Sequence, residues 1–169
     1  HAKGDKPSKP DDLGKLSSGE LINVLKHPNK WHRQTAQRLL ADRCDKSIVP
    51  RLTSLMMKGN GQFALECFWA INHCGGFNTG LAAYTLTHSH PFIRHWTIRL
   101  LGDDHLMTPT LRAKLIALAK TETHAEVRSC LAASCKRWAA KDSFPILAAL
   151  IRRDEDVNDK HIPLLIWWA

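Results

Sequence analysis

The sequence lacks the long apolar runs of a membrane protein and the short motifs of the common enzyme classes. Its longest apolar run, from Ile162 to Ala169, has eight residues, whereas a transmembrane helix needs about 20. No HExxH zinc motif, P-loop, dinucleotide-binding glycine fingerprint or nucleophile elbow occurs. We therefore predict that this chain does not insert into a membrane, is not an enzyme, and binds no cofactor or metal.

Cysteine motifs are also missing, although five cysteines are present. No two form a CxxC pair, and the spacing fits neither a zinc ribbon nor a c-type haem attachment site. Cys67 and Cys74 would share a helix face but lie about 10 Å apart along the axis, too far for a disulfide. We predict free, buried thiols that pack as small apolar side chains at Cys44, Cys67, Cys74, Cys130 and Cys135.

Acidic residues are too few to balance the basic ones in the first third of the chain. The net charge is +8, and residues 1–60 contribute +6 of it, from 12 basic and 6 acidic residues. Residues 121–169 are neutral, with 7 of each sign. A basic excess can attract a polyanion or an acidic partner domain, but a solvated surface is the simpler interpretation. Residues 1–16 are rich in Lys and Pro and are predicted to form a flexible linker or the remnant of a tag.

No stretch alternates apolar and polar residues as a half-buried strand requires; instead, one helical unit recurs. The segment from His27 to Arg43 opens with a His-Pro-Asn turn and continues with apolar residues at helical spacing. Similar segments follow from His90 to Asp104 and from Thr123 to Ser134. Repetition of a helical unit is typical of an α-solenoid. We predict an all-α fold, a right-handed α-α superhelix of about five helix pairs between residues 17 and 169.

Helix boundaries are predicted from capping residues and from glycine or proline breaks. Ser17 and Glu20 form a capping-box pattern before the first helix, and Asn29 is suited to cap the second. Later N-caps are predicted at Ser47, Thr108 and Asp142, each followed by a proline in the first helical turn.

The second helices of the five pairs align on positions spaced 30 to 34 residues apart, namely Arg33, Ala64, Arg94, Arg128 and His161. Residues three and seven positions further on are small or apolar, as a buried seam between repeats requires. An arginine early in the second helix of a helix-turn-helix unit resembles HEAT repeats, and the resemblance covers about residues 17–169. A ladder of Arg–acid pairs would be interrupted at Ala64 and His161.

A narrower resemblance rests on three segments, WHRQTAQRLLADR, FWAI and DEDVNDKHIPLLIWWA. Together they look like the HEAT region of large exported bacterial proteins that join a sugar-dehydrogenase-like β-propeller, HEAT repeats and a c-type haem domain. The resemblance implies a fragment of a longer chain, in a membrane-associated or exported protein of the periplasm. Neither the haem motif nor the propeller occurs here, so no electron-transfer residue is carried over. The odd number of free cysteines argues mildly against an oxidising compartment.

The sharpest site prediction is a row of side chains five positions after the alignment point. In a HEAT-like stack the second helices line the concave side, so Arg38, Trp69 and Arg99 would be neighbours there. A guanidinium beside an indole offers cation–π contact and anion binding. We predict a partner-binding row that also includes the nearby side chains Gln34, Glu66 and His95. The simpler interpretation is a solvated face with a half-buried Trp.

Three functions are compatible with these patterns. The first is a non-enzymatic scaffold that binds a protein or neighbouring domains of the same chain. The second is a nucleic-acid-binding module of the HEAT-like DNA-glycosylase type, favoured by the net charge and by the Arg–Trp–Arg row. The third is a spacer without a ligand. We predict the scaffold, because no clear catalytic Asp is expected on the concave face and the last third of the chain is neutral.

The remaining histidines and tryptophans are assigned to structure. The ten histidines are predicted to act in turns and helix caps, as at His88 and His90. Core or inter-domain packing is predicted for Trp31, Trp96, Trp138, Trp167 and Trp168.

Overall fold

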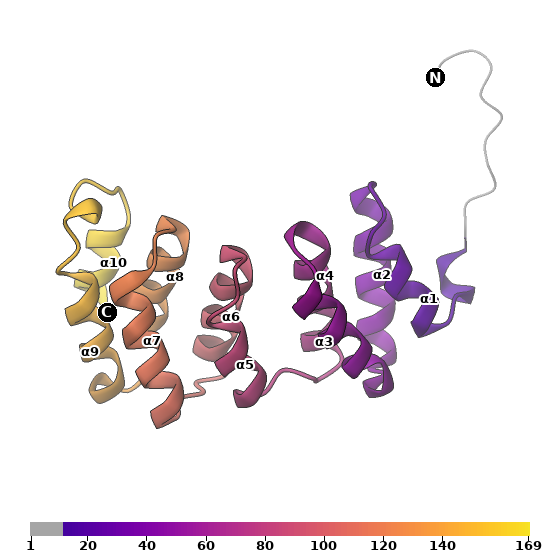
Figure 1. The fold of residues 1–169 in the computed structure, drawn as a ribbon, viewed down its shortest axis with the longest axis horizontal. Helices are drawn as coiled ribbons and strands as arrows, with labels where there is room; N and C mark the ends of the chain where they lie inside the picture. Colours follow the sequence, from indigo (N-terminus) through magenta and orange to yellow (C-terminus); the bar gives the residue numbers. More distant parts are fainter. Residues whose placement is uncertain (1–11) are drawn as a thin grey trace, which may run out of the picture. The chain divides into compact units, whose positions relative to one another are not determined.

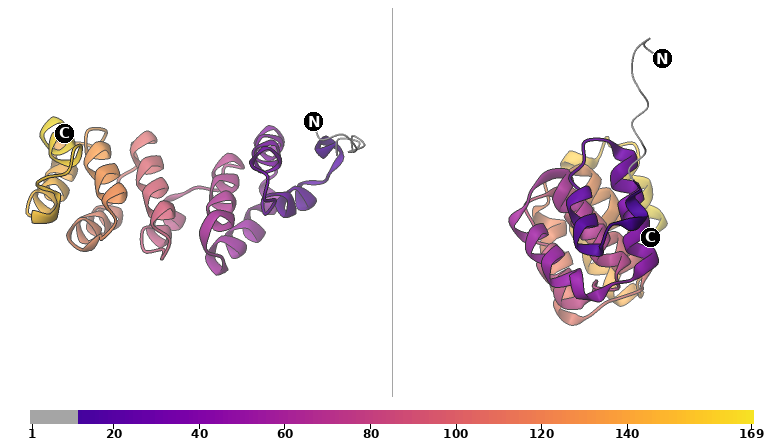
Figure 2. Two further views of the ribbon diagram at one scale, coloured as in Figure 1. Left: turned by 90° about the horizontal axis from the view of Figure 1, so that it is seen from above. Right: turned by 90° about the vertical axis from the view of Figure 1, so that its right-hand side faces the viewer.

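The computed structural model describes residues 12–169, which form helices joined by turns and loops (Figure 1). It contains ten α-helices and three short 3-10 helices there, and no strand. The prediction of an all-α chain is therefore confirmed. The chain divides into two compact units, His1–Gly76 and Phe77–Ala169, and Figure 2 shows their helices from two further directions. Among residues 12–169, none of the helices has the length and apolar character that crossing a bilayer requires.

The first unit is built around one long helix. Its helical segments are η1 (Leu13–Lys15), α1 (Ser18–Val24), α2 (Lys30–Arg43), η2 (Lys46–Ile48), α3 (Val49–Lys58) and α4 (Gly61–His73). Helix α2 packs against α1 on one side and α4 on the other, and α3 packs against α4. Fully buried side chains fill the space between these helices, among them Leu21, Leu40, Leu52, Phe68 and Ile71.

The second unit has two series of helices that pack in register. Its segments are α5 (Thr79–Thr85), α6 (Pro91–Asp103), α7 (Pro109–Thr121), α8 (Ala125–Cys135), α9 (Ala140–Leu150), η3 (Asp154–Asp156) and α10 (Ile162–Trp168). Helices α5, α7 and α9 contact one another in that order, and so do α6, α8 and α10. Each helix thus packs on the helix that lies two places further along the chain.

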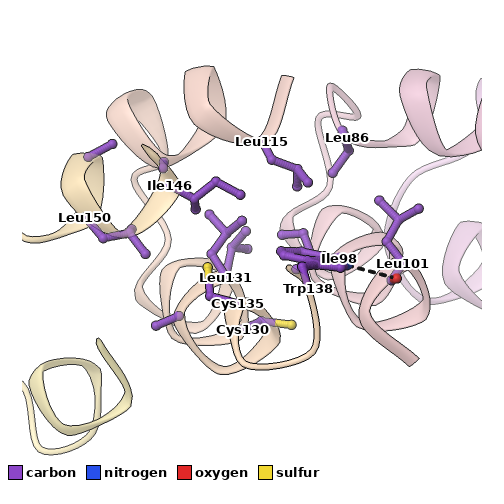
Figure 3. Packing of buried hydrophobic residues seen from close by; sticks show 14 of the residues in the cluster. Leu86, Ile98, Leu101, Leu115, Cys130, Leu131, Cys135, Trp138, Ile146 and Leu150 are labelled. Carbon is purple, nitrogen blue, oxygen red and sulfur yellow. Dashed lines mark hydrogen bonds between the residues drawn. The ribbon is translucent and has the colours of Figure 1, made fainter. Parts of the chain in front are cut away.

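Apolar side chains from both series meet in the core of the second unit (Figure 3). Leu131 from α8 and Ile146 from α9 are fully buried in it, and each such side chain stabilises the fold by roughly 1.5–3 kcal/mol. The indole of Trp138 is also buried, and its Nε1 donates a hydrogen bond of 3.1 Å to the Leu101 carbonyl on α6. The predicted packing role of Trp138 is therefore confirmed.

Three of the predicted helix starts are confirmed at the level of individual hydrogen bonds. The capping box is complete, because the Glu20 carboxylate accepts from the Ser17 N–H at 2.7 Å and the Ser17 hydroxyl accepts from the Glu20 N–H at 3.3 Å. Asn29 accepts from the N–H of Trp31 at 2.9 Å. Thr108 accepts from the N–H of Leu111 at 3.2 Å. These caps were predictable because both partners lie within three residues of each other.

Two predicted N-caps are wrong. Just before α3, Asp45 accepts from both the N–H and the hydroxyl of Ser47, at 3.0 and 2.6 Å, so the turn forms around Asp45. Asp142 lies inside the first turn of α9, and its carboxylate instead accepts from the Arg112 guanidinium at 2.9 Å. Ala139 takes the cap position of α9 without a side-chain hydrogen bond.

The predicted linker, residues 1–16, extends too far into the folded chain. Residues 1–11 lie outside the described residues, but Leu13 is buried and residues 13–15 form η1. The guanidinium of Arg43 donates to the Leu16 carbonyl at 2.7 Å and to the Gly14 carbonyl at 3.0 Å. This segment is therefore held against the end of α2.

Replacing the first N-cap tests whether it stabilises the first unit. We expect Ser17→Ala to lower the free energy of unfolding by about 1 kcal/mol, because the Glu20 N–H in the first turn of α1 loses its acceptor and the Glu20 carboxylate loses the Ser17 hydroxyl donor. Chemical denaturation followed by circular dichroism measures this change. Ser54→Ala, at an exposed position inside α3, is the matched control and should change stability by less than about 0.5 kcal/mol. Equal stabilities for both variants would contradict a capping role.

Candidate partner-binding surface and the arginine–carboxylate network

The turns that lead into α2 and α6 have the same hydrogen bonds. The Nδ1 atom of His27 accepts from the N–H of Asn29 at 3.0 Å, and that of His88 accepts from the N–H of His90 at 3.0 Å. His27 thus closes the turn before α2, and His88 closes the turn before α6. The predicted turn role of these two histidines is confirmed.

Each of these helices also carries an arginine in its first turn, and the arginine side chain donates to carbonyls of the loop that precedes the helix. Arg33 donates through Nη1 to the carbonyls of His27 and Pro28, at 2.8 and 2.9 Å. Arg94 donates in the same way to the carbonyls of His88 and Ser89, at 2.7 and 3.0 Å. These carbonyls belong to a turn and have no helical partner, so each guanidinium satisfies acceptors that the backbone leaves open.

Each of these arginines also pairs with an acid from later in the chain. Arg33 donates through Nε to Glu66 at 2.9 Å. Arg94 holds Glu122 with two parallel bonds of 2.7 Å, from Nε and Nη2. The fork geometry of guanidinium suits a carboxylate held in this way.

A third pair extends the series in the second unit. Arg128 donates to Asp156 through Nε at 2.7 Å and Nη2 at 2.5 Å, and its Nη1 reaches the Glu122 carbonyl at 3.2 Å. Arg94, Glu122, Arg128 and Asp156 are therefore linked by hydrogen bonds, with the link from Arg128 to Glu122 made through the main-chain carbonyl. We name these four residues the arginine–carboxylate network. Arginines 33, 94 and 128 are the three that the repeat alignment placed together, and each pairs with an acid.

The network is largely removed from water, and this makes it structurally important. Glu122, Arg128 and Asp156 are all buried. Removing one member of a buried ion pair costs about 3–5 kcal/mol, because the other charge is left without a partner. Burial alone would raise the pKa of Glu122, but the hydrogen bonds from Arg94 and from the His124 N–H outweigh it, so this pKa lies below its ordinary value.

Glu66, predicted as part of the partner-binding row, is buried in the first unit. Its carboxylate accepts from Arg33, from Gln37 at 2.9 Å and from Gln62 at 2.8 Å. The structure therefore places Glu66 in the packing between α2 and α4, so this residue does not belong to an exposed surface.

The exposed side of α2 carries Trp31, Gln34, Arg38 and Asp42. The spacing of three, four and four residues places these side chains on one helix face, which we name the α2 face. The indole of Trp31 is 57% exposed, so this residue is not part of the core. The predicted row does not include Trp31, for which the sequence predicts core or inter-domain packing.

The same pattern recurs on α6. Phe92, His95, Arg99 and Asp103 occupy positions equivalent to those of the α2 face, counted from Arg94 instead of Arg33. Phe92 is 42% exposed, His95 is half-buried, and the other two are exposed. We name this set the α6 face. An aromatic residue two positions before the arginine that binds the preceding turn is the sequence signal that could have identified both faces.

Contacts with α8 hold the α6 face in place. The Phe92 ring packs edge-on against His124, with 5.5 Å between ring centroids. His95 Nδ1 lies 3.2 Å from the Glu126 carbonyl. Asp103 pairs with Arg99 at 3.0 Å and with Arg137 of the following loop at 3.1 Å.

The predicted row of Arg38, Trp69 and Arg99 takes residues from both compact units. Arg38 is exposed on α2, and Trp69 is half-buried on the neighbouring helix α4. Arg99 is exposed on α6 of the second unit. The two arginines thus have the exposure that binding requires, and the row itself stays a prediction.

Four of the five cysteines are buried, as predicted, and Cys44 is exposed. Burial raises the pKa of the Cys67 thiol to about 12 and that of Cys135 to about 12. The prediction is wrong for Cys44 because this residue follows the last turn of α2, where the backbone adopts a left-handed conformation with φ of +48°. Within the described residues, no three His, Cys, Asp or Glu side chains gather where they could hold a metal ion.

No protein-family model, curated protein or solved structure matches this chain.

The lowered pKa of Glu122 predicts how the free energy of unfolding depends on pH. Because this pKa lies below its ordinary value of 4.5, the folded protein favours the carboxylate form more than the unfolded chain does. The resulting stabilisation is complete above about pH 4.5 and is lost as the pH falls through the lower, folded-state pKa.

We expect Glu122→Gln to lower the free energy of unfolding at pH 7 by about 3 kcal/mol. The difference from the original chain should shrink as the pH falls below about 4.5. Denaturant titrations between pH 7 and pH 3 measure it. Glu126→Gln, on the exposed side of α8, is the control and should show no comparable loss. A deficit that is constant down to pH 3 would show that the charge of Glu122 is not its source.

Proposed function

We propose that this chain is a non-enzymatic helical-repeat scaffold that binds a protein partner through the α2 face and the α6 face. The observation that carries the proposal is the recurrence of one exposed pattern, an aromatic residue, a polar residue, Arg and Asp, on two helices. Core packing does not explain the pattern, because most of these side chains are exposed. Exposed aromatic and Arg side chains repeated on two helices support contact with a partner, because these residue types are enriched at protein interfaces.

The proposed architecture is a right-handed solenoid of five HEAT-like helix pairs, from α1 and α2 to α9 and α10. Two observations support it. In the second unit, first helices pack on first helices and second helices on second helices, as stacked repeats require. Arg33 and Arg94 also make the same set of bonds to a preceding turn and a following acid.

A protein partner fits these faces better than a nucleic acid does. Trp and Arg are the residues that most often dominate the binding energy of protein interfaces. In each face the exposed Arg is followed four residues later by Asp, and in the α6 face the two are ion-paired. Such charge-balanced faces complement a partner with charges of both signs, whereas phosphate binding needs unpaired cations.

The resemblance to the HEAT region of exported multidomain proteins bears on the choice of partner. It makes neighbouring domains of a longer chain, of the propeller or haem type, the first partners to test. It also directs the search to the periplasm or another exported location.

Photo-crosslinking tests the two faces directly. We expect a crosslinker placed at Gln34 or at His95 in the full chain to capture one common protein, identified by mass spectrometry. Crosslinkers at Ser54 of α3 and Thr110 of α7, both exposed, are matched controls and should not capture it. The double variant Arg38→Ala, Arg99→Ala should weaken capture at least tenfold while leaving the helical content unchanged, because both side chains are exposed. Equal capture from faces and controls would contradict the proposal.

The nucleic-acid alternative is tested with a fluorescent DNA duplex and a single strand across a salt series. We expect no binding at micromolar protein concentrations. Binding that weakens steeply with salt and disappears in the same double variant would instead establish a nucleic-acid module.

A further inference from the structure

Two of the cysteines occupy equivalent places in the first unit. Cys44 is the C-cap of α2, and Cys74 is the C-cap of α4. Helices α2 and α4 pack directly against each other, so the ends of these helices bring together residues that are far apart in sequence.

Each thiol lies against the end of the other residue's helix. The Sγ atom of Cys44 is 3.9 Å from the carbonyl of His73, which is the residue bonded to Cys74. The Sγ atom of Cys74 is 3.8 Å from the Leu40 carbonyl, and that carbonyl also accepts from the N–H of Cys44 at 3.0 Å. These contacts place both thiols where the ends of α2 and α4 meet, and joining the two sulfur atoms requires rotation of the side chains and movement of the helix ends.

The two thiols differ in their access to solvent. Cys44 is exposed, whereas Cys74 is 1% exposed. Burial raises the pKa of the Cys74 thiol, and the neighbouring Cys44 and Asp45 raise it further. A dissolved oxidant can therefore reach Cys44 first, and Cys74 is placed to react only with a group already attached to Cys44.

We propose that Cys44 and Cys74 form a redox modification site that closes to an intramolecular disulfide when a small-molecule disulfide of the glutathione class is the oxidant. The Cys44 thiolate attacks one sulfur of the oxidant, forms a mixed disulfide and releases one small thiolate. The Cys74 thiolate then attacks the Cys44 sulfur, which forms the Cys44–Cys74 bond and releases the second small thiolate. The two protein thiols lose two electrons and two protons, and the small disulfide is reduced to two thiols.

Closing this bond would tie α2 to α4 and constrain a loop of about 30 residues. The first unit would then be rigid in oxidising conditions and less constrained in reducing ones. The other three cysteines are not suited to this reaction. Cys67 is buried within α4, and Cys130 and Cys135 are buried in the second unit.

The test treats the full chain with oxidised glutathione and counts free thiols. We expect the number of free thiols to fall by two from five. The molecular mass should fall by that of two hydrogens, with no glutathione added. Digestion with trypsin and chymotrypsin separates Cys67 from Cys74, so mass spectrometry should find a crosslink between the Cys44 and Cys74 peptides. The midpoint of thermal unfolding should rise by about 5 °C or more and return after reduction.

Two serine variants complete the design. Cys44→Ser changes an exposed side chain and should abolish both the crosslink and the thermal shift, whereas Cys130→Ser in the second unit should leave both unchanged. Three outcomes would overturn the proposal. These are an unchanged thiol count, glutathione retained on Cys44 as a stable mixed disulfide, and a disulfide between two chains seen on a non-reducing gel.

Discussion

The second unit depends on a buried series of charges more than on any single apolar contact. Glu122 accepts two bonds from Arg94 through its side chain and one from Arg128 through its carbonyl, and Arg128 in turn holds Asp156. Apolar packing would tolerate small shifts of one helix along another. A guanidinium fork that must meet a carboxylate and a turn carbonyl together tolerates very little, so these pairs determine the register between α6, α8 and η3.

The same arginines connect the interior with the exposed faces. Arg33 and Arg94 point inward and bind the turn that precedes their own helix. This fixes the rotation of α2 and α6 about their axes, and the opposite side of each helix must then face solvent. Trp31 and Phe92 lie two residues before these arginines, and their exposure follows from that rotation. The faces proposed to bind a partner are therefore positioned by buried charges behind them.

Local features were predictable from sequence, and the features that depend on distant residues were not. The caps at Ser17, Asn29 and Thr108 were predictable because each depends on neighbours within three residues. The cap predicted at Asp142 failed because Arg112, 30 residues earlier, takes its carboxylate. Within the predicted row, Arg38 and Arg99 are exposed, and helical periodicity is sufficient to place each on an outward side of its helix. Glu66 is buried because Arg33 and Gln37, on another helix, draw it inward.

A double-mutant cycle on Arg128 and Asp156 tests most directly whether buried charge pairing holds the second unit together. The variants are Arg128→Met, Asp156→Leu and their combination, with free energies of unfolding from denaturant titration. We expect each single variant to lose about 3–5 kcal/mol. The double variant should lose at least about 2 kcal/mol less than the sum of the two, because neither charge is then left alone. Losses that add to within about 0.5 kcal/mol would contradict this account.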